Sequence, residues 1–245
     1  MISIVTGTLN RVHLLPGLIE NTVNSNEKLE LVLVDGGSED GTIQYIRSLN
    51  HPRINLIEIG RRSSYPHFMN IGIKNSKYDI ICQWNDDVLL VNEWEEVFNE
   101  INDETDFYLF DWKYGNPSDM KNQSWLDGTD TPVSNGGWCL LNNIANPDPI
   151  TGNDEIVMNY GLYKKKIFKS IGMYNYDYSY YGADADMANR SYRFGYKVKD
   201  LKNIKVCTLY TEKRAILYAE DWAICEKNKN LYKNKILPEN LEYLV

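Results

Sequence analysis

The chain has 245 residues, with 26 basic against 34 acidic side chains and a formal net charge of −8. This acidic balance argues against broad binding to nucleic acid or to anionic membranes, because both require a basic surface. With 43% hydrophobic and 24% charged residues, the composition is that of a globular protein with one large domain or two small ones.

The four cysteines, Cys82, Cys139, Cys207 and Cys225, lie far apart and form no Cys-x-x-Cys pair. Neither a disulfide framework nor a zinc site is indicated, and we infer a reducing compartment. The N-terminus lacks the basic and apolar regions of a signal peptide, and no window approaches the length of a membrane span. We therefore expect a cytoplasmic protein.

Over the first 100 residues, short apolar segments alternate with segments whose apolar residues recur at helical spacing. Strands are predicted at 2–6, 29–34, 54–59 and 79–84, and helices at 14–23, 42–49 and 66–76. Strands that alternate with helices in this way form βαβ units around a mostly parallel sheet. The first half of the chain is therefore expected to be an α/β fold.

The second half of the chain is less regular. Helices are predicted at 94–101, 164–171, 184–194 and 214–232, and strands at 107–110, 156–163 and from 195 onward. Gly172 is placed to end the helix 164–171. The stretch 113–153 shows no clear periodicity, which fits either a wall of a binding site or an ordinary surface excursion.

Polar residues follow three of the predicted strands directly. They are the segments Thr6–Arg11, Asp35–Gly41 and Asn85–Asp87. Ligands of open parallel sheets bind beyond the carboxyl ends of the strands, so these segments are expected to meet at one edge. The adjacent Gly36 and Gly37 permit positive φ and the close approach of a ligand.

The acidic segment Asn85–Asp87 follows the apolar run Ile80–Trp84. Adjacent carboxylates repel each other, so a bound divalent cation would explain their place at the end of a buried strand. Asp and Asn oxygens suit Mg²⁺ or Mn²⁺, which commonly join protein carboxylates to substrate phosphates. The alternative is a plain polar turn, since short acidic motifs are common.

In this order and spacing, the motifs resemble those of the GT-A glycosyltransferases, specifically the inverting family 2, over residues 2–198. The matching segments are Thr6-x-x-x-Asn10-Arg11, Asp35-Gly36-Gly37-Ser38-x-Asp40-Gly41-Thr42, Asn70-x-Gly72, Asn85-Asp86-Asp87, Leu162-Tyr163-Lys164-Lys165 and Gly182-Ala183-Asp184-Ala185-Asp186 with Arg190. The resemblance implies a GT-A (Rossmann-like) α/β fold with a mostly parallel central sheet flanked by helices. It implies one domain over residues 1–245, with a nucleotide-sugar-binding half (1–100), an acceptor-side half (101–211) and a C-terminal helix and tail (212–245).

The resemblance also implies roles for single residues on the donor side. A nucleotide sugar, a UDP-sugar by family analogy, would be bound by Thr6, Asn10, Arg11, Asp35, Gly36, Gly37, Asn70, Asn85 and Asp86. Asp87 matches the last acidic position of the family's DxD motif and would ligate Mn²⁺ or Mg²⁺ on the diphosphate, whereas Asn85 occupies the first position without adding charge. Such a metal stabilises the negative charge that develops as the nucleotide leaves.

On the acceptor side, Asp184 matches the family's general base. It would take the proton from an acceptor hydroxyl while that oxygen attacks the anomeric carbon from the opposite face, which inverts the configuration. A helix N-terminus would keep this carboxylate ionised and make it a weaker base. Asp186 is a second candidate base, with an ion pair to Arg190 one helical turn later as its structural alternative.

Two features depart from the family pattern. Ala183 stands where the family has Glu, which leaves the acceptor class open. Many GT-A enzymes add a late His as a metal ligand, but His13, His51 and His67 all lie early in this chain. Weak metal binding is therefore expected.

Two rival functions stay open. A sugar-phosphate nucleotidyltransferase would carry a Gly-rich basic loop after the first strand, and Gly7–Arg11 has one Gly and one Arg. A non-catalytic module that binds sugar nucleotides or glycans would show losses such as Ala183 and Asn85. Candidate acceptors are a glycan, a lipid-linked sugar, a protein or a modified nucleobase; the acidic charge and the lack of a membrane anchor argue mildly against DNA and a polyprenyl phosphate.

Overall fold

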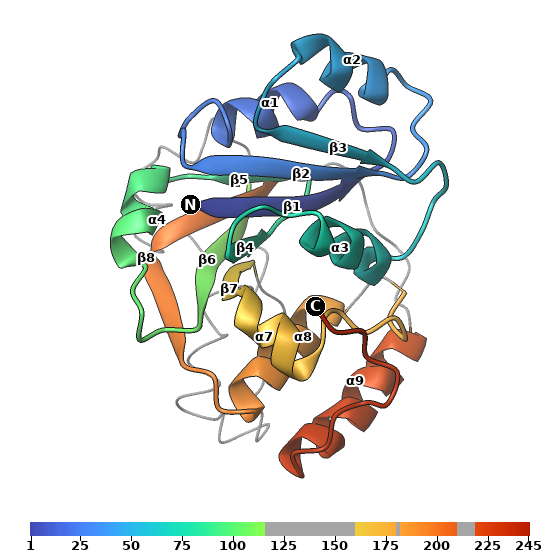
Figure 1. The fold of residues 1–245 in the computed structure, drawn as a ribbon, viewed down its shortest axis with the longest axis vertical. Helices are drawn as coiled ribbons and strands as arrows, with labels where there is room; N and C mark the ends of the chain where they lie inside the picture. Colours follow the sequence, from blue (N-terminus) through green and yellow to red (C-terminus); the bar gives the residue numbers. More distant parts are fainter. Residues whose placement is uncertain (116–159, 180–181, 210–218) are drawn as a thin grey trace.

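A computed structural model of the chain describes residues 1–115, 160–179, 182–209 and 219–245 (Figure 1). Within these residues eight strands form a single sheet, in the order β3-β2-β1-β4-β7-β6-β8-β5. Helices lie on both sides of this sheet (Figure 1). The predicted architecture, a mostly parallel central sheet flanked by helices, is confirmed.

The N-terminal half closely follows the predicted pattern. The strands are β1 (Ile2–Thr8), β2 (Leu29–Asp35), β3 (Ile54–Glu58) and β4 (Ile80–Gln83), and the helices are α1 (Leu15–Asn21), α2 (Thr42–Leu49) and α3 (Tyr65–Lys74). All four strands pair in parallel. Almost every residue of β1 and β2 is buried, as near-continuous apolar runs require when helices cover both faces of a sheet.

The second half adds elements of mixed direction. They are β5 (Val88–Leu90), α4 (Trp94–Glu100), β6 (Phe107–Gly115), β7 (Gly161–Lys164), α7 (Lys165–Ile171), α8 (Ala183–Arg193), β8 (Val198–Leu209) and α9 (Ala219–Lys233). β7 runs antiparallel to both β4 and β6, and β5 runs antiparallel to β8. Gly172 ends α7 with a positive φ of 83°, as predicted.

Several predictions for this half need correction or lie outside the described residues. β5 was not predicted, because three residues are too short for a periodic signal. The predicted strand 156–163 is observed from Gly161, with 156–159 outside the described residues. The predicted irregular stretch begins inside β6 at Lys113–Gly115, and its remainder, like residues 214–218 of the last predicted helix, lies outside them.

Aromatic packing joins the two halves of the sheet beneath its carboxyl edge. The ring centroid of the fully buried Trp84 lies 5.7 Å from Trp94, 5.8 Å from Phe110 and 6.2 Å from Tyr160. Such tilted and edge-to-face pairs add to the stabilisation from burial. Among the residues that the structure describes, no helix combines the length and apolar character needed to cross a bilayer.

Helix α3 packs on β1 through a glycine, and this contact gives the first prediction. A Cβ placed on Gly72 would lie 2.2 Å from Cγ1 of Val5. Overpacking of this kind costs about 1–3 kcal/mol, so Gly72→Ala is expected to lower the free energy of unfolding by that amount in urea denaturation.

Gly17 provides the matched control, because it is exposed in α1 and a Cβ there would meet nothing within 4 Å. Gly17→Ala is expected to leave stability unchanged or raise it by about 0.4–1 kcal/mol. Equal stability of the two variants would contradict the close approach of α3 to β1.

Candidate active site

The acidic turn Asn85–Asp87 lies at the carboxyl end of β1. β4 pairs in parallel with β1, and the N–H of Trp84, directly after β4, donates to the carbonyl of Val5 at 3.1 Å. Beyond it, the Thr8 hydroxyl donates to Oδ2 of Asp86 at 2.9 Å. Two of the three predicted polar segments therefore meet at one edge of the sheet.

Asp87 is held at this edge by two further segments. Its carbonyl accepts a hydrogen bond of 2.7 Å from the N–H of Leu209, the last residue of β8. Its carboxylate is only 2% exposed, and Oδ2 lies 3.8 Å from Nη1 of Arg11, which follows β1. Asp87 thus presents a buried negative charge beside a cation, and the structure brings the predicted metal ligand next to Arg11, which was predicted to bind the nucleotide sugar.

Asp35 ends β2 and shapes the loop that follows it. Its fully buried carboxylate accepts hydrogen bonds from the N–H groups of Gly37 at 2.8 Å and Ser38 at 2.9 Å, and from the Ser38 hydroxyl. Gly37 has φ +89°, and a Cβ there would lie 2.9 Å from the carbonyl carbon of Gly60. The hydrogen bonds of Asp35 thus hold this loop in place, and its predicted contact with the nucleotide stays a prediction.

Asn10 joins the loop after β1 to the loop after β2. It adopts φ +54°, its N–H donates to the Ser38 hydroxyl at 2.9 Å, and its side-chain oxygen accepts from the N–H of Glu39 at 2.8 Å. Asp40 adds a second link by accepting from the N–H of Val12 at 2.9 Å. These bonds hold the two loops together. The third predicted polar segment, Asp35–Gly41, therefore lies at the same edge of the sheet as the other two.

Three other predicted binding residues are buried, in β1, in the loop after β2 and in α3. The Thr6 hydroxyl donates to the carbonyl of Gly7 at 3.1 Å. A Cβ on Gly36 would lie 3.1 Å from the ring of Phe68. The Asn70 carboxamide donates to the carbonyl of Tyr174 at 2.8 Å and accepts from its N–H at 2.9 Å. The hydrogen bonds of Asn70 thus join α3 to the segment after α7.

Tyr160 is a residue of this edge that sequence reasoning missed. Its hydroxyl accepts hydrogen bonds from Nδ2 of Asn85 at 3.3 Å and from the hydroxyl of Thr208 on β8 at 3.2 Å. It therefore anchors the first residue of the acidic turn to the far half of the sheet. No motif or periodicity marks Tyr160 in the sequence.

Asp184 lies in the first turn of α8, which begins after Gly182 at φ +78°. The residue is partly exposed, and the positive end of the helix dipole stabilises the negative charge of its carboxylate. Ala183 beside it is fully buried. A glutamate, which the family has here, would have to displace the packing around this position.

The charge of Asp184 acts on two buried tyrosines, one of which is hydrogen-bonded to the end of β4. Burial raises the pKa of Tyr65 well above its usual range, and the charge of Asp184 raises it further. The pKa of Tyr174 is also raised, by burial first and then by neighbours that include Tyr65 and Asp184. The Tyr174 hydroxyl donates to Oε1 of Gln83, the last residue of β4. Asp184 is therefore within electrostatic reach of a group bonded to the strand that carries the acidic turn.

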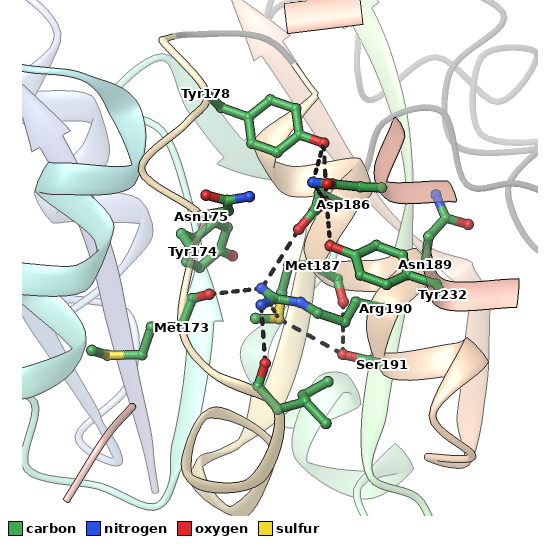
Figure 2. Close-up of polar contacts among 12 residues, drawn as sticks. Met173, Tyr174, Asn175, Tyr178, Asp186, Met187, Asn189, Arg190, Ser191 and Tyr232 are labelled. Atoms are coloured by element: carbon green, nitrogen blue, oxygen red, sulfur yellow. Dashed lines mark hydrogen bonds and ion pairs between the residues drawn. The ribbon is translucent and has the colours of Figure 1, made fainter. Parts of the chain in front are cut away.

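Asp186 faces the interior of the protein instead. It is 4% exposed, and its carboxylate accepts hydrogen bonds from Tyr178 and Tyr232 (Figure 2). Asn228 is a third donor. The predicted ion pair with Arg190 is confirmed, at 3.6 Å. An enclosed carboxylate with these partners favours the structural alternative over the role of second base.

The arrangement of strands and loops can now be compared with known proteins. The family model of glycosyl transferase family 2 matches residues 3–138, more than half of the chain. The chain belongs to glycosyl transferase family 2. No curated protein gives a significant match to it.

Solved structures share the fold of this family 2 chain at low sequence identity. TarS 1–349 from S. aureus in complex with UDP-GlcNAc has a TM-score of 0.70 and 15% identity, over 98% of this chain and 68% of that one. The mannosyltransferase PcManGT from Pyrobaculum calidifontis in complex with GDP-Man and Mn²⁺ has a TM-score of 0.59 and 17% identity, over 87% of this chain and 58% of that one. The family 2 chain thus spans about 58–68% of these two proteins, and the likeness confirms the GT-A fold.

The donor atoms at the acidic turn suit a hard divalent cation, but the protein supplies few of them. Asp86 and Asp87 supply carboxylate oxygens, which Mg²⁺ and Mn²⁺ prefer. Within the described ranges, no three His, Cys, Asp or Glu side chains are grouped so that they could hold a metal. Arg11 also lies beside Asp87. A cation here would take most of its ligands from a substrate diphosphate and water.

This ligand set predicts that metal binding depends on the nucleotide. In isothermal titration, Mn²⁺ alone is expected to bind weakly, because the Arg11 cation opposes it. UDP or GDP should tighten Mn²⁺ binding by about 5–150-fold, the range of typical coupling between two ligands. Asp87→Asn should remove this gain. Tight binding of Mn²⁺ without nucleotide would contradict the prediction.

Proposed function

We propose that this chain is a metal-dependent inverting glycosyltransferase that moves a sugar from a nucleotide sugar to an acceptor hydroxyl, with Asp184 as the general base. The observation that carries the proposal is the edge where Asp86 and Asp87 meet the loops after β1 and β2. Asp184 lies within electrostatic reach of Tyr174, which bonds to the end of β4. Family membership supports the same reaction class.

On the donor side, the loops after β1 and β2 would hold the nucleotide, and Arg11 would face its diphosphate. A divalent cation, Mn²⁺ or Mg²⁺, held by Asp86 and Asp87 would supply positive charge against the developing charge of the leaving group. Arg11, which is partly exposed beside Asp87, would contribute to the same stabilisation.

On the acceptor side, Asp184 would accept the proton of the attacking hydroxyl. The oxygen attacks the anomeric carbon on the face opposite the nucleotide, the bond to the diphosphate breaks, and the configuration inverts. The start of α8 keeps the carboxylate ionised, which is the form that a general base needs.

A UDP-sugar is the donor that we propose, to a glycan or another hydroxyl acceptor. The solved structures with this fold carry UDP-GlcNAc in one case and GDP-Man in the other, so both donors belong in a first screen. A non-catalytic module that binds sugar nucleotides is the second candidate. It is favoured by the buried Ala183 and by Asn85, which bonds to Tyr160.

A thermal-shift screen of UDP and GDP with Mn²⁺ tests nucleotide binding. A ligand at 100 times its dissociation constant should add about 2.7 kcal/mol to the stability of the folded state. Incubation with labelled UDP-GlcNAc or GDP-mannose then separates the two candidates. Release of the nucleoside diphosphate identifies an enzyme, and binding without release identifies a binding module.

The role of Asp184 is tested by Asp184→Asn. This variant is expected to bind the donor as the wild type does, because Asp184 belongs to α8 and not to the loops after β1 and β2. Sugar transfer should fall by about 100-fold or more, as removal of a general base does. Asp103→Asn, which changes an exposed carboxylate before β6, is the matched control and should keep full activity. Normal transfer by Asp184→Asn would show that the base is a different residue.

A further inference from the structure

A buried cluster of polar side chains lies on the inner side of α8, which carries both Asp184 and Asp186 (Figure 2). Two residues along an α-helix turn the side-chain direction by about 200°. Asp184 is accordingly partly exposed while Asp186 is buried. Helix α8 therefore carries one partly exposed carboxylate and another that is buried in the protein interior.

Oδ1 of Asp186 gathers three donors from two other segments. Asn228 and Tyr232 of α9 donate at 3.0 and 2.6 Å, and Tyr178, before α8, donates at 3.0 Å. Burial and the nearby charge of Asp186 raise the pKa of both tyrosines, so their hydroxyls stay protonated and donate. The carboxylate thus joins α8 to α9 and to the segment before α8.

Arg190 extends the cluster to the end of α7. Its guanidinium is fully buried, lies 3.6 Å from Oδ2 of Asp186 and donates to the carbonyls of Ile171 at 3.0 Å and Met173 at 2.6 Å. Figure 2 shows the guanidinium between the carbonyl of Met173 and the carboxylate of Asp186. One ion pair on α8 therefore fixes the positions of α7, α9 and the segment between α7 and α8.

A second contact of α9 continues toward the proposed site. Asp221, in the first turn of α9, accepts from the N–H of Ser179 at 2.8 Å. The carbonyl of Ser179 accepts from the N–H of Tyr65 at 3.2 Å, and Tyr65 is one of the two tyrosines coupled to Asp184. Helix α9 thus contacts α8 through Asp186 and is joined through Ser179 to Tyr65, the first residue of α3.

A buried ion pair is a weak source of net stability, because desolvation of both charges offsets their attraction. Its directional bonds do restrict how the joined elements are oriented. We propose that Asp186 is a positioning residue, which fixes α8 against α9 through Tyr178, Asn228 and Tyr232 and thereby sets the place of the Asp184 carboxylate. This inference rests on the proposed function, and it makes the C-terminal helix, which lies beyond the residues 3–138 of the family match, part of the catalytic unit.

The test compares two buried tyrosines. Tyr232→Phe removes one hydrogen bond to Asp186 and keeps the ring. Tyr108→Phe is the matched control: Tyr108 is also buried, its hydroxyl accepts from the N–H of Asn102 and donates to its carbonyl, and it lies on β6. Each variant is assayed well below its melting temperature for release of nucleoside diphosphate from the donor that the wild type uses.

Tyr232→Phe is expected to lower kcat by about tenfold or more, the scale of a small misplacement of a catalytic group. The dissociation constant for the donor should change by less than about twofold, because the nucleotide loops are not touched. Tyr108→Phe should keep the wild-type kcat. Hydrogen exchange should speed up at α8 amides in Tyr232→Phe and stay unchanged in Tyr108→Phe. Asp186→Asn should show the same pattern more strongly where it folds.

A wild-type kcat in Tyr232→Phe would overturn the inference, and so would an equal loss in both tyrosine variants, which would indicate general destabilisation. Failure of the proposed function has a different signature. It would appear as a wild-type protein that releases no nucleoside diphosphate, or as an Asp184→Asn variant with full activity.

Discussion

The parallel pairing of β1 with β4 sets the edge of the sheet on which the proposed site depends. Its register places Val5 opposite Gln83, so the chain that leaves β4 passes the end of β1, where Thr8 holds Asp86. β2 pairs on the other side of β1, with Thr8 opposite Asp35. Because these strands are buried, a shift of either would leave interior backbone groups without partners. The acidic turn and the two loops proposed to hold the nucleotide are therefore brought together by backbone pairing before any ligand binds.

Sequence periodicity was sufficient for the parallel half of the sheet, because β1 and β2 are apolar runs bounded by polar residues. It missed β5, which has only three residues. It also did not give the direction of β7, because the residue pattern of a short strand does not depend on whether the strand pairs in parallel or antiparallel. Motif matching selected Asp35 and Asn70 as site residues but did not predict the groups to which they are hydrogen-bonded. A buried polar side chain can form its hydrogen bonds with a loop, with a neighbouring segment or with a ligand. Which of these it does is seen only from its partners in the folded chain. Tyr160 had no sequence signal.

The two carboxylates of α8 show which contacts the spacing of residues along the chain can predict and which it cannot. The spacing of Asp186 and Arg190 by one helical turn predicted their ion pair, and the structure contains it. The donors from Asn228 and Tyr232 lie about 40 residues further along the chain, where no spacing rule applies. Their presence changes the interpretation of Asp186 from a candidate base to the centre of a support for Asp184. The catalytic proposal thus depends on contacts made by the C-terminal helix as much as on the family motifs.

The most direct measurement is a crystal structure of the chain with a UDP-sugar and Mn²⁺. The account predicts a diphosphate beside Asp86 and Asp87, a base against the loop that Asp35 shapes, and an anomeric carbon whose open face is turned toward Asp184. A nucleotide bound away from the carboxyl ends of β1 and β2 would contradict the account. So would a sugar turned away from Asp184, because no proton acceptor would then face the attacking hydroxyl.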